Sequence, residues 1–403
     1  MANLPQPRRW RALPPGIWAL GFVSLFMDMS SELIHSLLPI FMVTTLGASM
    51  LTVGIIEGLA EATAAVVKVF SGALSDYFRR RKLVVVIGYA LAALTKPIFP
   101  LANSVSWVFA ARFIDRIGKG IRGAPRDALI ADLTPSGLRG AAYGLRQALD
   151  SSGALLGPLL AIVLMLLLAN DIRAVMWVAV IPAFIAVFLL IAYVREPQQV
   201  QEQALPGTRL SLGDVRYLPR RYWLVVALGS VFTLARFSEA FLILRAEDIG
   251  LTLGFVPLVM IVMNLFYAGA AYPAGAAADR MSQRKLMLLG LALLIAADLL
   301  LAVADSTAWV LAGAALWGLH MAFTQGLLSK LVADTAPSRL LGSAFGLFNL
   351  VSGLMLLLAS VIAGALWGAF GPEATFLSGA CFALLAVIGL LIGARTQPTH
   401  TGP

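Results

Sequence analysis

Acidic and imidazole side chains recur at helical spacing inside the first two apolar stretches of the chain. Asp28, Glu32 and His35 are spaced i, i+4 and i+7, which places them on one face of a helix. Glu57 and Glu61 repeat the i, i+4 spacing in the second stretch. An ionised side chain at the centre of a bilayer costs about 2.5–3.5 kcal/mol on insertion scales, so such groups are usually functional or paired. We interpret Asp28, Glu32, Glu57 and Glu61 as candidate proton carriers, because neighbouring carboxyls can take up and release a shared proton.

Basic side chains in the same half are the expected charge partners of these acids. The stretch at 105–129 carries Arg112, Arg116 and Lys119 at helical spacing. Counting about 1.5 Å per residue, these groups reach depths similar to those of the acids. We therefore predict that charges from the first, second and fourth stretches meet in a wet crevice. The alternative is that they form structural ion pairs that only fix helix positions. Further charges in this half are Lys96, Asp115, Arg122, Arg146 and Asp150.

Two alternatives concern His35 and the quieter second half. His35 can relay a proton or ligate a metal, but a lone helical histidine is more often a satisfied polar residue. No second cluster of metal ligands accompanies it, so we predict no metal site and no cofactor. In the second half, Arg236 and Glu239 are spaced i, i+3 and are expected to pair. Polar candidates for substrate contact on the stretch at 307–333 are His320 and Gln325.

The elements that carry these groups follow from composition. The chain has 403 residues, of which 60% are hydrophobic and 13% are charged, too few charges for a water-soluble globule. Apolar stretches long enough to cross a bilayer as helices recur throughout. We predict an all-α membrane protein with about twelve spans, at roughly 17–43, 50–73, 83–101, 105–129, 140–168, 173–194, 221–244, 253–277, 285–304, 307–333, 341–368 and 374–394.

The net charge of +9 is best interpreted as a topology signal. Basic residues gather at alternate ends of the spans, for example at 79–82, 195–221 and 280–285, whereas the opposite ends carry little beyond Arg173 and Arg245. This asymmetry predicts that both termini and the central polar segment are cytoplasmic. It argues against nucleic acid as a partner and favours the cell membrane, with a bacterial inner membrane as the expected location. The single Cys381 leaves no disulfide framework.

The chain divides into two similar halves. Asp132, Pro135 and Gly144 align with Asp334, Pro337 and Gly346 at an offset of 202, and Trp107 aligns with Trp309 at the same offset. Residues 195–219 are the one long polar interruption, rich in charge, proline and glycine. We predict an N-terminal six-helix bundle at 1–194, a cytoplasmic linker at 195–219 and a C-terminal six-helix bundle at 220–403, arranged as parallel repeats.

Several loop and helix motifs carry a family resemblance. Gly72-x-Leu74-x-Asp76, followed by a basic cluster that includes Arg80, resembles motif A of the major facilitator superfamily, and Gly275 to Asp279 is a weaker copy. Arg79 stands where that family usually has glycine. Gly153, Gly157 and Pro158 resemble motif C of the family's antiporters, although the trailing glycines are absent. The resemblance covers nearly the whole chain. It implies the twelve-helix major facilitator fold, in which spans one and four line the central cavity and motifs A and C govern conformational change.

Together these observations predict a secondary transporter, with no nucleophile–base arrangement that would indicate an enzyme. The resemblance to drug/proton antiporters favours proton-coupled export of a small organic compound by alternating access. It also implies a monomer, the usual state in this family. One alternative is a proton-coupled or facilitative importer of an organic anion or a metal chelate, which the arginines of the fourth span favour. An alternative of another class is a membrane scaffold or a receptor-like protein without transport.

Overall fold

The computed structural model describes residues 13–78, 80–196, 217–337 and 340–393. The described residues form helices and turns without a strand, so the predicted all-α architecture is confirmed. Ten helical stretches among them are long and apolar enough to span a membrane. The two remaining predicted spans are also helical. The helix at Val105–Leu133 is too rich in charge to meet the apolar criterion, and the stretch at 220–248 is interrupted. Both of these stretches carry candidate site residues from the sequence analysis, which are Arg112, Arg116 and Lys119 in the first and Arg236 and Glu239 in the second.

The chain forms two compact units. Unit 1 comprises residues 1–42 and 63–209, and unit 2 comprises residues 43–62 and 210–403. Helix α3 (Met50–Phe78) contributes its first part to unit 2 and its second part to unit 1. The proposed linker at 195–219 lies almost wholly outside the described residues, so the predicted boundaries at 194 and 220 stay a prediction.

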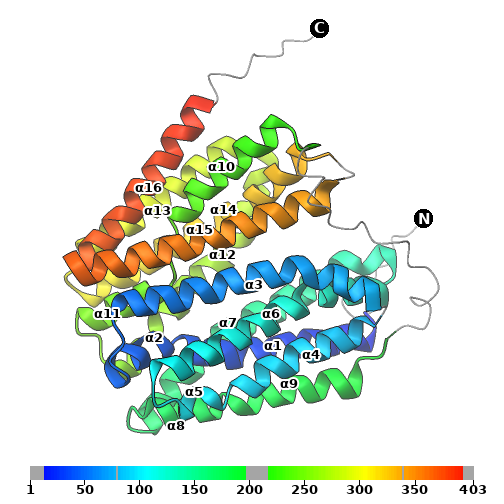
Figure 1. Cartoon of the computed structure of the whole chain (residues 1–403), viewed down its shortest axis with the longest axis horizontal. Coiled ribbons are helices and arrows are strands. Elements are labelled where there is room, and N and C mark those ends of the chain that lie inside the picture. The colour runs from blue at the N-terminus through cyan, green and yellow to red at the C-terminus, as the bar shows by residue number, and fades with distance from the viewer. Residues whose placement is uncertain (1–12, 79, 197–216, 338–339, 394–403) are drawn as a thin grey trace, which may run out of the picture. The chain divides into compact units, whose positions relative to one another are not determined.

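Unit 1 is built on the packing of α1 against α7 and α9, and of α4 against α6 and α9 (Figure 1). Its core is apolar and joins α1, α4, α6, α7 and α9 through residues such as Leu20, Met27 and Tyr89. The elements of unit 1 are α1 (Pro15–His35), α2 (Leu38–Ile40), α4 (Arg81–Thr95), α5 (Ile98–Leu101), α6 (Val105–Leu133), η3 (Ser136–Leu138), α7 (Arg139–Leu167), α8 (Ile172–Val178) and α9 (Val180–Tyr193). The π-helical turn η2 (Phe41–Thr45) follows α2 and leads out of the unit.

Local sequence explains where these helices begin and bend. Pro15 opens α1, where its fixed φ suits the first turn and its missing N–H costs nothing. Pro39 follows a break at residues 36–37, so the first span continues as α2 and η2 instead of as one rod. At the N-terminus of α8 the Asp171 side chain accepts a hydrogen bond from the Ala174 N–H at 3.1 Å.

Unit 2 packs α14 against α12 and α13, and α16 against α13, α15 and α10 (Figure 1). The first part of α3 belongs to this unit, where Gly58 closely approaches Leu357 of α15. Its other elements are α10 (Arg220–Leu234), α11 (Ala240–Asp248), η6 (Leu253–Phe255), α12 (Leu258–Arg280), α13 (Gln283–Ala302), α14 (Thr307–Thr335), α15 (Leu341–Phe370) and α16 (Pro372–Gly393).

The seventh predicted span is discontinuous. Helix α10 ends at Leu234 and α11 begins at Ala240, with Arg236–Ser238 between them in no regular structure. Side chains satisfy part of the backbone that this break frees: Ser238 N–H donates to the Ser360 hydroxyl at 3.1 Å. The Ala240 N–H donates to the Ser238 hydroxyl at 3.3 Å. Irregular backbone at membrane depth is tolerated where such partners exist, and it often marks a binding region.

Internal repetition extends to individual contacts between helices. In unit 1 Arg81 of α4 pairs with Asp132 of α6, and in unit 2 Gln283 of α13 donates to Asp334 of α14 at 3.1 Å. Both residues of each pair are related by the offset of 202. Likewise, Gly88 packs against Arg122 in unit 1, and at the same offset Gly290 packs against Thr324 in unit 2. The helix pairs α4–α6 and α13–α14 are therefore structural equivalents, residue by residue.

Candidate functional site

Histidine and arginine meet where α1 faces α6 in unit 1. The Arg112 guanidinium lies 3.3 Å from His35 Nε2, and His35 Nδ1 lies 3.8 Å from the Glu32 carboxylate. Arg112 and His35 are 3% and 8% exposed, so this contact is buried. Three of the predicted site residues therefore form one chain of polar contacts between the first and fourth spans.

A second buried layer joins α4 to α6. The Lys96 ammonium contacts the Asp115 carboxylate at 2.9 Å and donates a hydrogen bond to the Ser31 hydroxyl at 3.0 Å. Lys96 is 2% exposed and Asp115 is 4% exposed. The geometry is that of a buried ion pair with one additional acceptor, which fixes α4 relative to α6 and α1.

Two carboxyl groups meet between α1 and α7. The carboxyl groups of Asp28 and Asp150 interact electrostatically with each other. Two neighbouring carboxyl groups repel each other when both are ionised, so such a pair can hold one proton between them. Asp28, predicted as a proton carrier, thus has an acidic partner on the fifth span.

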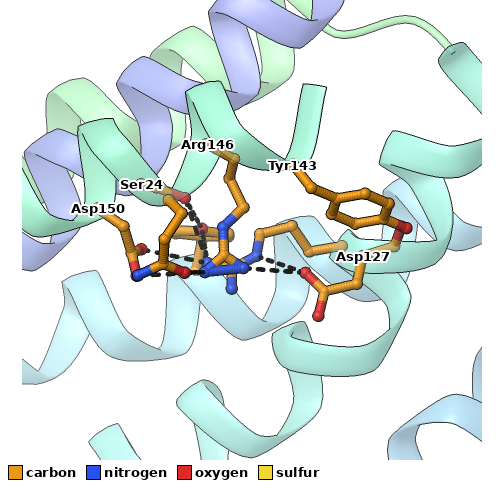
Figure 2. Close-up of polar contacts among 8 residues, drawn as sticks. Ser24, Asp127, Tyr143, Arg146 and Asp150 are labelled. Atoms are coloured by element: carbon orange, nitrogen blue, oxygen red, sulfur yellow. Dashed lines mark hydrogen bonds and ion pairs between the residues drawn. The ribbon is translucent and has the colours of Figure 1, made fainter. Parts of the chain in front are cut away.

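Two arginines contact the Asp150 carboxylate of this pair. Arg146 donates to Asp127 and to Asp150, at 3.2 Å in each case, and lies between the two carboxylates in Figure 2. Arg126 donates to the Ser24 hydroxyl at 3.2 Å and lies 3.9 Å from the Asp150 carboxylate. Asp150 is therefore held by two cations.

The remaining basic residues of α6 differ in burial and in what they contact. Arg116 is buried at 4% exposure, whereas Lys119 is exposed. Arg122 stacks on the Tyr89 ring, with its guanidinium carbon 4.6 Å from the ring centroid. Lys119 and Arg122 both act electrostatically on Asp28. Helix α6 thus presents a line of cations to the carboxyl pair.

In unit 2, polar groups collect at the break in the seventh span. Arg236 interacts electrostatically with Glu239, as the spacing predicted, and with Tyr267 of α12. His320 of α14 is fully buried, and its Nδ1 lies 2.8 Å from the Gly290 carbonyl oxygen. His320 Nε2 has no hydrogen-bond partner among the described residues, and the ring stacks on Phe232.

The second-span acids lie in the other unit from Asp28. Glu57 is fully buried and Glu61 is half-buried, and both belong to the part of α3 in unit 2. Polar contacts join α1 to α6, and further charged pairs involve α4 and α7. The convergence of the first, second and fourth spans in a wet crevice stays a prediction.

The motif residues differ in what can be described. Gly153 and Gly157 of α7 lie against the backbone of α1, where a Cβ at Gly157 would come within 2.7 Å of the Met29 carbonyl oxygen. Pro158 is buried inside α7, and Arg80 is exposed just before α4. Five predicted residues have side chains outside the described set: Gly72, Asp76, Gly275, Asp279 and Gln325.

Sequence reasoning missed Arg126, Asp127 and the polar pair Ser24–Tyr89. Arg126 and Asp127 lie within four residues of the predicted end of the fourth span at 129, and the sequence analysis gave them no role. The signal that could have found Arg126 is its i+4 spacing from Arg122. Among the described residues, no group of three or more histidine, cysteine, aspartate or glutamate side chains could hold a metal ion.

Comparison with known proteins bears on the family and the fold. The sequence profile described as Major Facilitator Superfamily matches residues 20–256 and 225–403. An uncharacterized MFS-type transporter of Methanocaldococcus jannaschii is 33% identical over 390 residues, covering 95% of each chain. Multidrug resistance protein MdtH of Photorhabdus laumondii is 30% identical over 162 residues, which are 40% of this chain and 39% of the relative. The crystal structure of nucleoside transporter NupG superposes with a TM-score of 0.80 at 13% identity, covering 95% of this chain and 100% of the other.

Proposed function

The chain belongs to the major facilitator superfamily of multi-pass membrane transporters, and from that premise we propose that it exports a small organic compound in exchange for protons. Secondary transport is the activity of the family. The proton as coupling ion and the outward direction are our proposal.

The observation that carries proton coupling is the interaction between the carboxyl groups of Asp28 on α1 and Asp150 on α7. A shared proton between two carboxyls can be lost when a cation approaches and regained when it retreats. Arg126 and Arg146 already contact Asp150 from two sides. A shift of α7 against α1 would therefore change how strongly the pair holds its proton, and this couples proton binding to conformation.

Export is supported by the packing of α7 on α1. Gly153 and Gly157 let the two backbones approach closely, as motif C does in the family's antiporters. The partial similarity to a multidrug resistance protein points in the same direction. In unit 2, the interrupted span at Arg236–Ser238, with Glu239 and His320 near it, is the proposed substrate region because freed backbone and polar side chains meet there.

A second candidate is transport of an organic anion, supported by the charge of α6. That helix carries cations in excess of its acids, and a cation excess at membrane depth suits a negatively charged solute. Its basic residues are Arg112, Arg116, Lys119, Arg122 and Arg126, and its acids are Asp115, Asp127 and Asp132.

The setting of the transporter is part of the same proposal. We place the protein in a bacterial inner membrane as a monomer with both termini in the cytoplasm, on the distribution of basic residues. Bundles at 1–194 and 220–403, joined by the linker at 195–219, are the halves that alternate access. Its partners are lipid, protons and a small-molecule substrate.

The test uses purified protein in proteoliposomes with an imposed pH gradient. A panel of drugs, nucleosides and organic anions is screened for accumulation, and the flux of any hit is followed before and after the gradient is collapsed. Proton-coupled export predicts that accumulation stops when the gradient collapses. Unchanged accumulation contradicts proton coupling, and accumulation confined to organic anions selects the second candidate.

A further inference from the structure

Asp298 of α13 is a buried carboxyl that the proposed transport cycle has not used. Its side chain is fully buried, and neither carboxyl oxygen has a hydrogen-bond partner among the described residues. Asp298 lies one turn from the C-terminal end of α13, inside unit 2. Buried polar atoms are almost always hydrogen-bonded, so two orphaned oxygens on one side chain require an explanation.

The surroundings of this carboxyl are apolar and tightly packed. A Cβ at Gly379 of α16 would lie 2.6 Å from Asp298 Oδ2 and 3.0 Å from the Phe237 ring. Phe237 in turn packs on Trp317 at 5.3 Å and on Phe376 at 5.5 Å between ring centroids. Asp298 therefore borders a cluster of aromatic rings, and glycine at 379 leaves room for its carboxyl.

No described charge neutralises Asp298. Arg245 of α11 is the cation at this end of α13, but it donates to the carbonyl oxygens of Leu301, Ala302 and Ala304 and to Asp248. His320 of α14 hydrogen-bonds near the middle of α13, at Gly290. The other described charged or titratable groups on α13 and on the helices packed against it are Arg284 and Lys285 on α13, Tyr267 on α12, Lys330 and Asp334 on α14, and Glu373 and Cys381 on α16. None of these contacts the Asp298 carboxyl.

The internal repeat shows what is missing. At the offset of 202, Asp298 is the equivalent of Lys96, and Trp317 is the equivalent of Asp115. In unit 1 these positions hold an ion pair at 2.9 Å. In unit 2 the partner position holds an indole whose Nε1 also lacks a hydrogen-bond partner. Position 298 is therefore buried like its equivalent at 96, but no residue of opposite charge stands at the partner position 317.

We propose that Asp298 is a proton-binding site of unit 2, occupied by a proton in this conformation. Burying an isolated ionised carboxylate among aromatic rings is unfavourable because the charge loses its hydration, whereas the neutral acid avoids most of that cost. The proton enters from water and returns to water when the aromatic cluster opens, and the carboxylate then remains hydrated. This proposal rests on the proposed function and assigns a second proton site to it.

Infrared spectroscopy tests the protonation directly, without any substrate. Reconstituted wild-type protein and Asp298→Asn are compared at neutral pH, with Asp305→Asn, an exposed acid just beyond α13, as matched control. The proposal predicts that the C=O band of a protonated carboxyl is present in the wild type and in the control and is reduced in Asp298→Asn. Loss of a carboxylate band instead overturns it. If the Asn variant does not fold, Asp298→Ser, smaller and uncharged, carries the same comparison.

Transport assays test the role of the site. Asp298→Asn is expected to keep substrate exchange without a gradient and to lose accumulation driven by a pH gradient, while Asp305→Asn keeps both. Full gradient-driven accumulation by Asp298→Asn overturns the coupling role and leaves the proposed function intact. A wild type that ignores the gradient overturns the proposed function, and the infrared band then decides alone whether Asp298 binds a proton.

Discussion

Units 1 and 2 contain equivalent helix pairs that pack in the same way but through different side chains. The pairs α4–α6 and α13–α14 share contacts at an offset of 202, from Arg81–Asp132 and Gln283–Asp334 at one end to Gly88 and Gly290 in the middle. Toward the other end they diverge, since unit 1 holds the ion pair Lys96–Asp115 and unit 2 holds Asp298 beside aromatic rings. One backbone arrangement therefore tolerates either paired charges or rings around a single carboxyl.

The same divergence occurs around the fifth long helix of each unit, α7 in unit 1 and α15 in unit 2. Arg146 of α7 bridges Asp127 and Asp150 in unit 1. Its equivalent on α15 is Phe348, which packs against Gly229 of α10 and is 8% exposed. Unit 1 thus has a charged arginine paired with carboxylates at this position, and unit 2 has an apolar phenylalanine packed against a glycine. The proposed proton sites therefore lie mainly in unit 1, with the single carboxyl of Asp298 in unit 2.

The largest expected effect comes from breaking the buried ion pair of unit 1. Lys96→Met leaves Asp115 buried without its cation and should lower the free energy of unfolding by about 3–5 kcal/mol. Because unit 2 does without this pair, the double variant Lys96→Met/Asp115→Leu should recover most of the loss. Denaturant titration in mixed micelles measures both. A double variant no more stable than the single one contradicts the comparison.

Removing the bridge at Arg146 should have the next largest effect. Arg146→Gln loses hydrogen bonds to two carboxylates, so we expect a loss of roughly 1.5–3 kcal/mol in the free energy of unfolding. Arg139→Gln, an exposed position on the same helix, should stay within about 0.5 kcal/mol of the wild type. Equal effects of the two substitutions would show that Arg146 does not hold the network together.

Close packing of α7 on α1 gives a third contrast between the units. Gly153→Ala places a methyl group against the Leu25 carbonyl oxygen and should cost about 1–3 kcal/mol of stability. The equivalent position in unit 2 is Met355, where Met355→Leu should cost less than about 1.5 kcal/mol. Thermal unfolding followed by tryptophan fluorescence compares them, and a Gly153→Ala protein as stable as the wild type would refute the close approach.

The smallest effect is expected where the two units agree most. Arg81→Gln gives unit 1 the side chain that unit 2 carries at Gln283, where a hydrogen bond to the equivalent aspartate is retained. We expect the free energy of unfolding to change by less than about 1 kcal/mol, as for other ion pairs near the surface. A larger loss, measured by the same thermal unfolding, would mean that the charge itself is needed in unit 1 and that the two positions are not equivalent.

Much of this arrangement is predictable from the sequence, because apolar length and charge asymmetry dictate spans and repeats. Helical spacing also placed Asp28, Glu32 and His35 on one face and Arg236 beside Glu239. Spacing within one helix says nothing of which helices meet, so the interaction of Asp28 with Asp150 on α7 was not foreseen.

Two features escaped for a different physical reason. The break at Arg236–Ser238 has neither proline nor glycine within it, and the partner that satisfies it, Ser360, is distant in sequence. The sequence analysis gave Asp298 no role, because no charged or polar residue lies three or four positions from it along the helix. The paired contacts of α4–α6 and α13–α14 show that its position is equivalent to that of Lys96.

The central claim, that the shared proton of Asp28 and Asp150 drives transport, is tested most directly by separating exchange from accumulation. Asp28→Asn keeps a hydrogen-bonding side chain of the same size but removes the exchangeable proton. In proteoliposomes we expect this variant to exchange labelled substrate across the membrane at close to the wild-type rate and to fail to concentrate it under a pH gradient. Undiminished gradient-driven accumulation by Asp28→Asn would contradict the account.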